Sequence, residues 1–143
     1  MKLGPRGSSL IKSYETLRLK AYMPTPKDRP TIGWGHVRGV KMGQVIDIIK
    51  AEQFFRDDVM MAEQIVNDLE VPLTSSQFDS LCSLAFNTGE LGETITGLLK
   101  DGHYYEACEF MFRWRKQKGV DLLGLARRRA REMSLFLEDG VLN

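Results

Sequence analysis

The sequence predicts a single, mostly helical α+β domain, in which a small amino-terminal lobe with a β-hairpin is joined by a long helix to a helical carboxy-terminal lobe. The length of 143 residues suits one domain. Prolines and glycines gather in residues 24–44, and apolar residues recur at helical spacing on both sides of that segment. We expect one domain over residues 1–143, with lobes at about 1–46 and 70–143 joined by a helix over 47–69.

The first predicted helix covers residues 8–22, SSLIKSYETLRLKAY. Its apolar residues recur at steps of three and four behind a serine cap. They are Leu10, Ile11, Tyr14, Leu17 and Ala21. This spacing puts them on one face of a helix, so the helix needs a partner elsewhere in the chain.

A β region is predicted next, between the first helix and residue 44. Pro24, Pro26 and Pro30 exclude a helix interior, because each fixes φ and lacks a backbone donor. The stretch TIGWGH follows, and glycines stand at positions 33, 35, 39 and 43. Glycines between Thr, Ile, Trp and Val residues indicate short strands and tight turns.

The rest of the chain is predicted to be helical. An apolar stripe over residues 47–69 makes this the longest helix, and Pro72 stops it. Thr74 and Gln77 have the spacing of a capping box, which opens another helix. The remainder divides into helices of ordinary length at three breaks: residues 87–93, 101–102 and 118–120.

The composition argues against several classes of protein. Apolar residues at 43% and charged residues at 27% disfavour disordered, collagen-like and membrane proteins. No apolar run approaches the about 20 residues that span a bilayer. The amino terminus, MKLGPRGSSLIKSYE, has no apolar segment typical of a secretory signal, so we expect the chain to stay in the cytosol when it is first made.

Charge is segregated along the chain, although the net charge is only +1. Residues 1–45 hold nine Lys or Arg against two acids, residues 46–109 hold three against thirteen, and residues 110–143 hold eight against four. If the two basic ends meet in space, they form a positive face suited to nucleic acid or a charged cell-wall glycan. The alternative is that these charges simply cover solvated helix faces.

Two cysteines, Cys82 and Cys108, lie among apolar residues in helical segments. Free cysteines in such surroundings usually behave as small buried apolar residues. A disulfide or a redox role is the alternative. The cysteines do not have the spacing of a zinc site.

Glu15 is a candidate general acid, because Tyr14, Leu17 and Leu19 surround it in the sequence. A carboxyl group partly removed from water has its pKa raised, as an acid working near neutral pH requires. The alternative is an ordinary surface residue of the first helix. His36 is either a catalytic base or, as we favour, a buried histidine held by a carboxylate, for which Asp58 is the expected partner.

Five stretches in order carry a family resemblance. They are YETLRLKAY, TIGWGH, LTSSQFDSLCSLAFNTG, ITGLLKDG and FRWRKQKGVDLLGLARRRARE. Together they resemble the phage-type lysozyme family, the endolysin muramidases, and the similarity covers almost the whole chain. Single motifs are weak, whereas five in sequence are specific.

The resemblance implies a lysozyme-like fold and a glycoside hydrolase that cuts the β-1,4 bond between N-acetylmuramic acid and N-acetylglucosamine in peptidoglycan. It implies no cofactor and no metal. The expected partner is peptidoglycan, without nucleic acid or an integral membrane segment, and we expect a monomer. As an endolysin for host lysis, it is expected in the host cytoplasm and then in the periplasm or cell wall, once another protein has permeabilised the membrane.

The resemblance also assigns the catalytic residues, with one departure. Glu15 matches the family glutamate and Thr31 the family threonine, but Pro24 stands where the family has an aspartate, nine positions after the glutamate. Asp28 is the only carboxylate in the loop before Thr31, so we expect it to replace the aspartate. Alternatively, Asp28 is a turn residue that bonds its own backbone.

Other positions are carried over by the resemblance. The pair of His36 and Asp58 is expected to tie the β region to the long helix. Three residues fall at positions lining the sugar cleft: Val37, Phe86 and Asn87. Trp114 is expected in the core. We expect the basic cluster Arg127, Arg128, Arg129 and Arg131 beyond the cleft, on a solvated helix face that attracts the anionic wall.

The missing aspartate leaves two alternatives to hydrolysis. An enzyme with a single effective carboxylate lets the sugar's own 6-hydroxyl attack, which makes it a lytic transglycosylase acting on the same bond. A chain that has lost catalysis is a wall-binding module. Glu15, Thr31 and the glycines of TIGWGH favour an active hydrolase over both.

Overall fold

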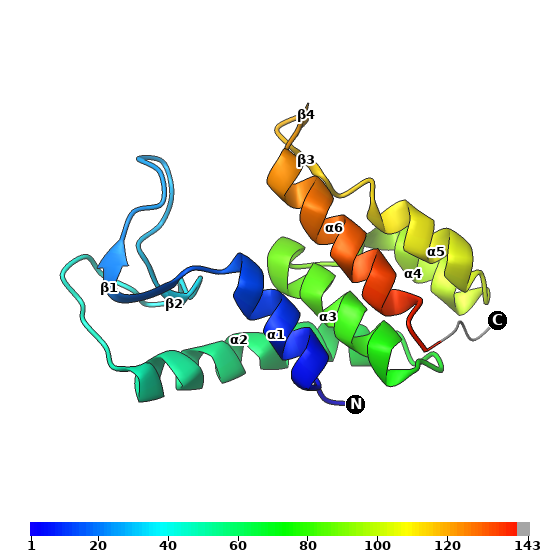
Figure 1. The fold of residues 1–143 in the computed structure, drawn as a ribbon, viewed down its shortest axis with the longest axis horizontal. Helices are drawn as coiled ribbons and strands as arrows, with labels where there is room; N and C mark the ends of the chain where they lie inside the picture. The colour runs from blue at the N-terminus through cyan, green and yellow to red at the C-terminus, as the bar shows by residue number, and fades with distance from the viewer. Residues whose placement is uncertain (140–143) are drawn as a thin grey trace.

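The computed structural model of the chain describes residues 1–139 and shows a mostly helical α+β fold (Figure 1), which confirms the predicted class. In chain order the elements are α1 (Pro5–Tyr14), β1 (Leu17–Tyr22), β2 (Thr31–Trp34), α2 (Ile48–Asn67), α3 (Ser75–Thr88), α4 (Gly92–Lys100), α5 (Tyr104–Met111), β3 (Lys116–Gln117), β4 (Val120–Asp121) and α6 (Leu123–Phe136). The strands β1 and β2 lie at the amino-terminal end of α2, away from α4 and α5.

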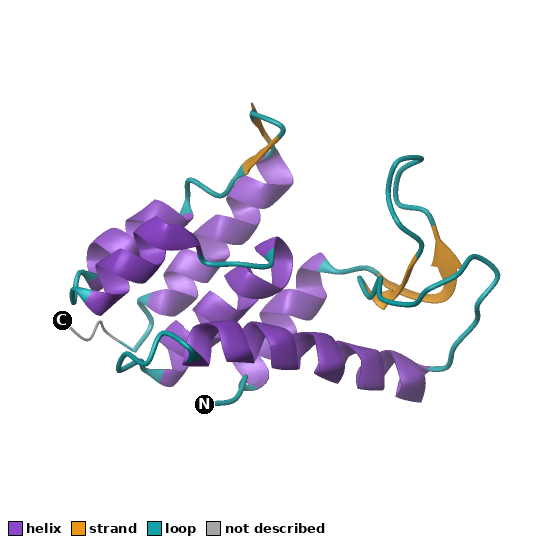
Figure 2. Ribbon diagram, turned by 180° about the vertical axis from the view of Figure 1, so that it is seen from behind, coloured by secondary structure: helices purple, strands orange, loops and turns teal. Residues whose placement is uncertain are grey.

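The long helix α2 runs from the β region to the helical part of the molecule (Figure 2). It begins at the predicted place because the Asp47 side chain accepts a hydrogen bond from the Lys50 amide at 2.8 Å. Its first turns pack against β2, and its later turns pack against α3. The helix therefore connects the two regions between which the site lies.

The central helix is α3, which packs against α1, α2 and α6. Residues 76–85 are all buried, including its polar side chains. Its start follows the sequence, since the Thr74 side chain and the Gln77 side chain cap each other's backbone amides. The main apolar core forms around α3 from residues of α2, α4, α5 and α6.

The predicted helix over residues 8–22 is wrong in its second half. Helix α1 ends at Tyr14, and Glu15 has an extended backbone with φ −104° and ψ 119°. Residues 17–22 form β1 instead. The alternation of Leu17, Leu19 and Ala21 with polar residues has the period of a strand, and pairing with β2 stabilises that choice.

The hairpin of β1 and β2 is antiparallel and irregular. Leu17 pairs with Trp34 and Tyr22 with Thr31, so β1 bulges between these two points. The bulged segment pairs instead with residues 44–46, through the Lys20–Val45 bridge. As predicted, residues 23–30 form no helix and make the loop at the tip of the hairpin.

Helix α1 packs mainly against the carboxy-terminal helices α3 and α6. One of its residues, Ile11, joins a second cluster with Trp34 of β2 and Phe55 of α2. The division into lobes at 1–46 and 70–143 stays a prediction. The break predicted at 118–120 is the turn of a small hairpin, β3–β4.

The two cysteines lie in the helical interior. Cys82 and Cys108 are buried and make no disulfide, as predicted. Burial raises the pKa of both thiols, in the case of Cys108 to about 11. Within residues 1–139, no helix has the length and apolar character needed to cross a membrane.

Replacing Thr74 by Ala should lower the free energy of unfolding by about 1 kcal/mol, because the α3 amino terminus loses a capping hydrogen bond. Urea unfolding followed by circular dichroism measures this. The control Ser75→Ala changes an exposed neighbour in the first turn and should alter stability by less than about 0.5 kcal/mol. Equal effects of the two substitutions would contradict the capping role.

Candidate functional site

A hollow of about 370 Å³ lies where the β region meets α2 and α3. Val37 and Phe86, both predicted to line the cleft, face it together. Its other walls are Arg29, Gly35, Arg38, Asp58, Met61, Ala62, Ile65, Ala85 and Gly89. Apolar surface from α2 and α3 thus meets charged residues from the β region in one hollow, a combination typical of ligand pockets.

Glu15 lies at the edge of this hollow, between the β region and α6. It is the residue directly after α1, and its amide still donates to the Ile11 carbonyl at 3.2 Å. Its Oε1 accepts a hydrogen bond from Nη1 of Arg128 at 3.3 Å. The Glu15 side chain keeps 23% of its surface exposed, so the carboxyl group is not sealed in the interior.

Gly35 brings the backbone of the β region directly against the Glu15 carboxylate. A Cβ atom at position 35 would lie 2.7 Å from Oε2 of Glu15, and the φ of Gly35 is +75°. Both the space and the backbone conformation therefore require glycine. Gly35 also lines the hollow, which places the Glu15 carboxylate next to it.

Burial raises the pKa of Glu15, as the sequence predicts. The Arg128 guanidinium opposes this effect, and the more distant negative charge of Asp58 reinforces it. Glu15 thus combines a partly desolvated carboxyl group with a fixed hydrogen-bond partner. This combination suits a proton donor.

The predicted basic cluster of α6 does not form a single solvated face, so that expectation is wrong. Arg127 and Arg131 are exposed, whereas Arg128 and Arg129 are buried. Helical rotation explains the split, since Arg128 and Arg129 share the face that packs on α3. Arg128 lies at the site instead of beyond it, in contact with Glu15.

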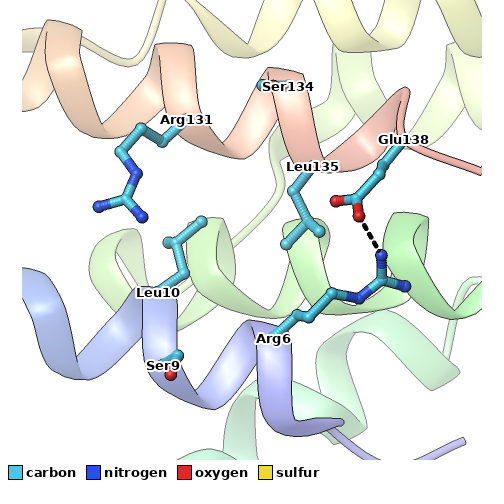
Figure 3. Close-up of a pocket in the computed structure, with 7 residues that line it drawn as sticks. All are labelled: Arg6, Ser9, Leu10, Arg131, Ser134, Leu135 and Glu138. Carbon is cyan, nitrogen blue, oxygen red and sulfur yellow. Dashed lines mark hydrogen bonds and ion pairs between the residues drawn. The ribbon is translucent and has the colours of Figure 1, made fainter.

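Arg131 lies over a separate groove between α1 and α6 (Figure 3). The groove has a volume of about 350 Å³, and Leu10 and Leu135 line it. At its other end Arg6 pairs with Glu138 at 2.5 Å. Arg131 donates to the Ser13 hydroxyl at 3.3 Å. These contacts link the two helices along a surface that shares no lining residue with the hollow.

Asp28 does not line the hollow beside Gly35 and lies in the exposed loop at the hairpin tip. Its carboxylate accepts a hydrogen bond from the Thr25 hydroxyl at 3.1 Å, and its amide donates to the Thr25 carbonyl at 3.1 Å. It lines a second hollow of about 680 Å³ together with Gln117 and Lys118 of the β3–β4 hairpin. Glu15 and Asp28 therefore lie at different hollows of the region between hairpin and helices.

Thr31 begins β2 and is buried. Its hydroxyl donates to the Arg29 carbonyl at 2.9 Å. With its proton engaged there, the Thr31 oxygen is left to accept a hydrogen bond from a water or a sugar hydroxyl. Arg29 lines the hollow, so Thr31 is connected to the hollow through its hydrogen bond to Arg29.

His36 and Asp58 form the predicted pair, with Nδ1 of His36 2.8 Å from Oδ2 of Asp58. The His36 ring also stacks on Phe54 of α2, with ring centroids 4.0 Å apart. Arg38 donates to the other Asp58 oxygen at 3.3 Å. These contacts join the turn after β2 to α2, which is the link between β region and helix that we expected.

The two remaining predicted positions lie on the α6 side. The Asn87 side-chain oxygen accepts a hydrogen bond from Nη2 of Arg129 at 2.9 Å, which turns its amide nitrogen away from Arg129. Asn87 follows Phe86 directly, at the end of α3 that borders the hollow. Trp114 is partly buried and packs against the main core, as predicted.

Sequence reasoning missed Arg128 and the buried Glu132 beside it. A signal was present, because both fall on the helical stripe that continues to Leu135 and Phe136. Charged residues on an apolar stripe indicate buried ion pairs. The role of Gly35 was also missed, since a glycine does not reveal which side chain lies against it.

Residues 1–139 contain no cluster of three or more His, Cys, Asp or Glu side chains that could hold a metal ion. The carboxylates at the site instead face guanidinium or imidazole groups. Asp58 contacts His36 and Arg38, and Glu15 contacts Arg128. The arrangement is suited to proton transfer by side chains.

Comparison with known proteins adds independent findings. The family described as phage lysozyme matches residues 12–132. The endolysin of Acyrthosiphon pisum secondary endosymbiont phage 1 is 40% identical over 95% of this chain and 98% of its own length. The solved endolysin from Escherichia coli O157:H7 phage FAHEc1 has a TM-score of 0.85 at 33% identity, covering 100% of this chain and 98% of the other.

A third relative is the muramidase domain of SpmX from Asticaccaulis excentricus, with a TM-score of 0.83 at 35% identity. The match covers 95% of this chain and 97% of that domain. These similarities agree with the order of the five sequence stretches and with the lysozyme-like arrangement of elements.

Replacing Asp58 by Asn should lower the free energy of unfolding by about 1 to 3 kcal/mol, because buried His36 loses its carboxylate partner. His36→Asn should have an effect of the same order. Chemical unfolding of the single and double variants measures the coupling. The control Arg38→Gln removes the exposed partner of the same carboxylate and should cost less than about 1 kcal/mol. Unchanged stability in both His36 and Asp58 variants would show that the pair is not structural.

Proposed function

Because the chain belongs to the phage lysozyme family, we propose that it hydrolyses the β-1,4 bond between N-acetylmuramic acid and N-acetylglucosamine, with Glu15 as the general acid. A peptidoglycan-lytic enzyme of the glycoside hydrolase class follows from that membership. The observation that carries the finer proposal is the Glu15 carboxyl group, which lies at the edge of the hollow between Arg128 and Gly35.

The proposed role of Glu15 is to protonate the oxygen of the leaving sugar. Burial raises its pKa, so it keeps its proton to a higher pH than an exposed carboxyl group does. Arg128 fixes the orientation of one carboxylate oxygen and leaves the other beside Gly35. Val37 and Phe86, which line the hollow, then bind the sugar through apolar contact. Asn87, whose oxygen accepts from Arg129, binds it through its amide nitrogen.

The second carboxylate of a glycosidase activates water or attacks the sugar, and we propose Asp28 for this role. It is the only carboxylate between Glu15 and Thr31 in the sequence. Within residues 1–139 its carboxylate has one side-chain hydrogen bond, the exposed one from Thr25, which a substrate or water can replace. Thr31, with its proton held by Arg29, would accept a hydrogen bond from the attacking water.

A second candidate reaction is favoured by the place of Asp28. It lies in an exposed loop and lines a different hollow from the one beside Glu15. In lytic transglycosylation Glu15 protonates the departing oxygen as the glycosidic bond breaks. The Glu15 carboxylate then takes the proton of the 6-hydroxyl of N-acetylmuramic acid, whose oxygen bonds to the anomeric carbon of the same sugar. The product is an anhydro sugar end, lighter by one water than the product of hydrolysis.

The biological setting that we propose is lysis of a bacterial host. The chain would be made in the host cytoplasm and reach the wall after another protein has permeabilised the membrane. Its relatives include endolysins of phages of Salmonella and Bacillus. Action as a monomer without nucleic acid stays a prediction.

Replacing Glu15 by Gln should reduce cleavage of purified peptidoglycan by roughly 10²- to 10⁴-fold, because the amide has no proton to give. The amide oxygen can still accept from Arg128, so the fold should persist. In the unmodified chain the rate should fall as the pH rises through the raised pKa of Glu15. Glu52→Gln, which removes an equal charge from α2, is the control and should keep its rate. Near-normal turnover by Glu15→Gln would remove Glu15 from the mechanism.

Replacing Asp28 by Asn should abolish hydrolysis while changing stability by no more than about 0.5 kcal/mol, because the residue is exposed. Mass spectrometry of the soluble fragments shows which reaction remains. The control Thr25→Val removes the Thr25 hydroxyl, keeps the carboxylate and should stay active. Unreduced cleavage with anhydro ends would establish transglycosylation, and unreduced hydrolysis would exclude Asp28. Binding to peptidoglycan without soluble fragments from the unmodified chain would instead indicate a wall-binding module.

A further inference from the structure

The interface between α3 and α6 contains a buried carboxylate that the proposed reaction does not use. The Glu132 side chain is fully buried. Its Oε2 accepts hydrogen bonds from the Ser83 hydroxyl at 2.5 Å, from Nη2 of Arg129 at 3.1 Å and from Nε of Arg128 at 3.3 Å. Its Oε1 lies 2.6 Å from Nε of Arg129. One anion therefore holds two cations.

Both guanidiniums also reach from this interface to the site. Arg128 donates to Glu15, the proposed acid, at 3.3 Å. Arg129 donates to Asn87, a proposed sugar-binding residue, at 2.9 Å. The backbone of α3 holds Arg128 as well, since Nη2 donates to the Ser83 carbonyl at 3.2 Å. A single carboxylate thus supports both cations, one in contact with the proposed acid and the other with a proposed sugar-binding residue.

Stability alone is a weak reason for this arrangement, because desolvating three charged groups offsets much of their attraction. We propose that Glu132 is a positioning residue for cleavage: it holds Arg128 in contact with Glu15 and neutralises part of the Arg128 charge. This inference rests on the proposed role of Glu15 as the acid. Arg128 contacts two carboxylates, and the one that is not the acid, Glu132, helps Glu15 to stay protonated.

The sign of the effect follows from the charges. Arg128 favours the ionised form of Glu15 and so opposes the burial that raises the pKa of Glu15. Without the negative charge of Glu132, the guanidinium acts on Glu15 at greater strength, and Glu15 loses its proton at a lower pH. Removing the Arg128 charge has the opposite consequence, so the two substitutions should shift the pH profile in opposite directions.

The other groups around Glu15 and Arg128 do not produce opposite shifts of the pH profile. From α2, Asp58 disfavours ionisation of Glu15, but neither substitution changes it. From α1, the Tyr14 ring lies 5.5 Å from the Arg128 guanidinium and contacts it as an aromatic face. From α3, the contacts come from the hydroxyl and carbonyl of Ser83, which do not titrate.

The test is the dependence of kcat on pH, measured with the full chain on purified peptidoglycan. In Glu132→Gln the basic limb should move to lower pH by roughly half to one unit, and in Arg128→Gln it should move to higher pH. Glu132→Asp, which retracts the charge by one methylene, should move the limb in the same direction as Glu132→Gln but less. Arg129→Gln should raise KM, and because it leaves more of the Glu132 charge to neutralise Arg128, it should not move the limb to lower pH.

The control is Ser80→Ala, because the Ser80 hydroxyl donates to the backbone carbonyl of Glu132 at 2.6 Å and does not touch its carboxylate. It should lower Tm without moving the limb. A limb that stays in place in every folded Glu132 variant, while Glu15→Gln abolishes cleavage, would overturn the inference and leave the proposed function intact. An equal shift in Ser80→Ala would also overturn it, and full activity of Glu15→Gln would overturn both.

Discussion

The packing of α6 on α3 is the constraint on which the rest of the structure depends. It buries Arg128, Arg129 and Glu132 against a helix whose own polar face is buried. An unpaired charge in this place would cost several kcal/mol, so the three side chains have few alternative arrangements. Because Arg128 and Arg129 contact Glu15 and Asn87, the requirements of the interior determine the geometry at the surface.

The β region contacts the Glu15 carboxylate as well, through the backbone of a glycine. Gly35 has no side chain where the Glu15 carboxylate lies, and its positive φ belongs to the tight turn in which His36 pairs with Ile32. The His36–Asp58 pair then fastens the turn to α2. The carboxylate is thereby held between a cation that belongs to the core and a backbone that belongs to the hairpin.

Much of the fold could be predicted from the sequence, because apolar periodicity, prolines and capping residues are local signals. The start of α2 at Asp47 and the capping box of Thr74 are examples. The end of α1 was not, since Leu17 and Leu19 fit both a helical and an alternating pattern and only pairing with β2 decides between them. The contact between His36 and Asp58 could be predicted. The contact between Glu15 and Arg128 could not, because it spans 113 residues and no local pattern pairs the two side chains. The position of Asp28 depends on loop conformation, which sequence spacing does not determine.

The placement of α1 has a consequence for when the protein becomes competent during synthesis. The carboxylate of Glu15 leaves the ribosome early, but the cation that contacts it lies 113 residues later, in the last helix of residues 1–139. At ordinary rates of translation this separation is on the order of ten seconds. Until α6 has emerged and docked, α1 has only part of its packing surface, and Glu15 faces water without its partner. The contact between Glu15 and Arg128 therefore forms only after α6 has been made, so a chain that stops short of α6 lacks it.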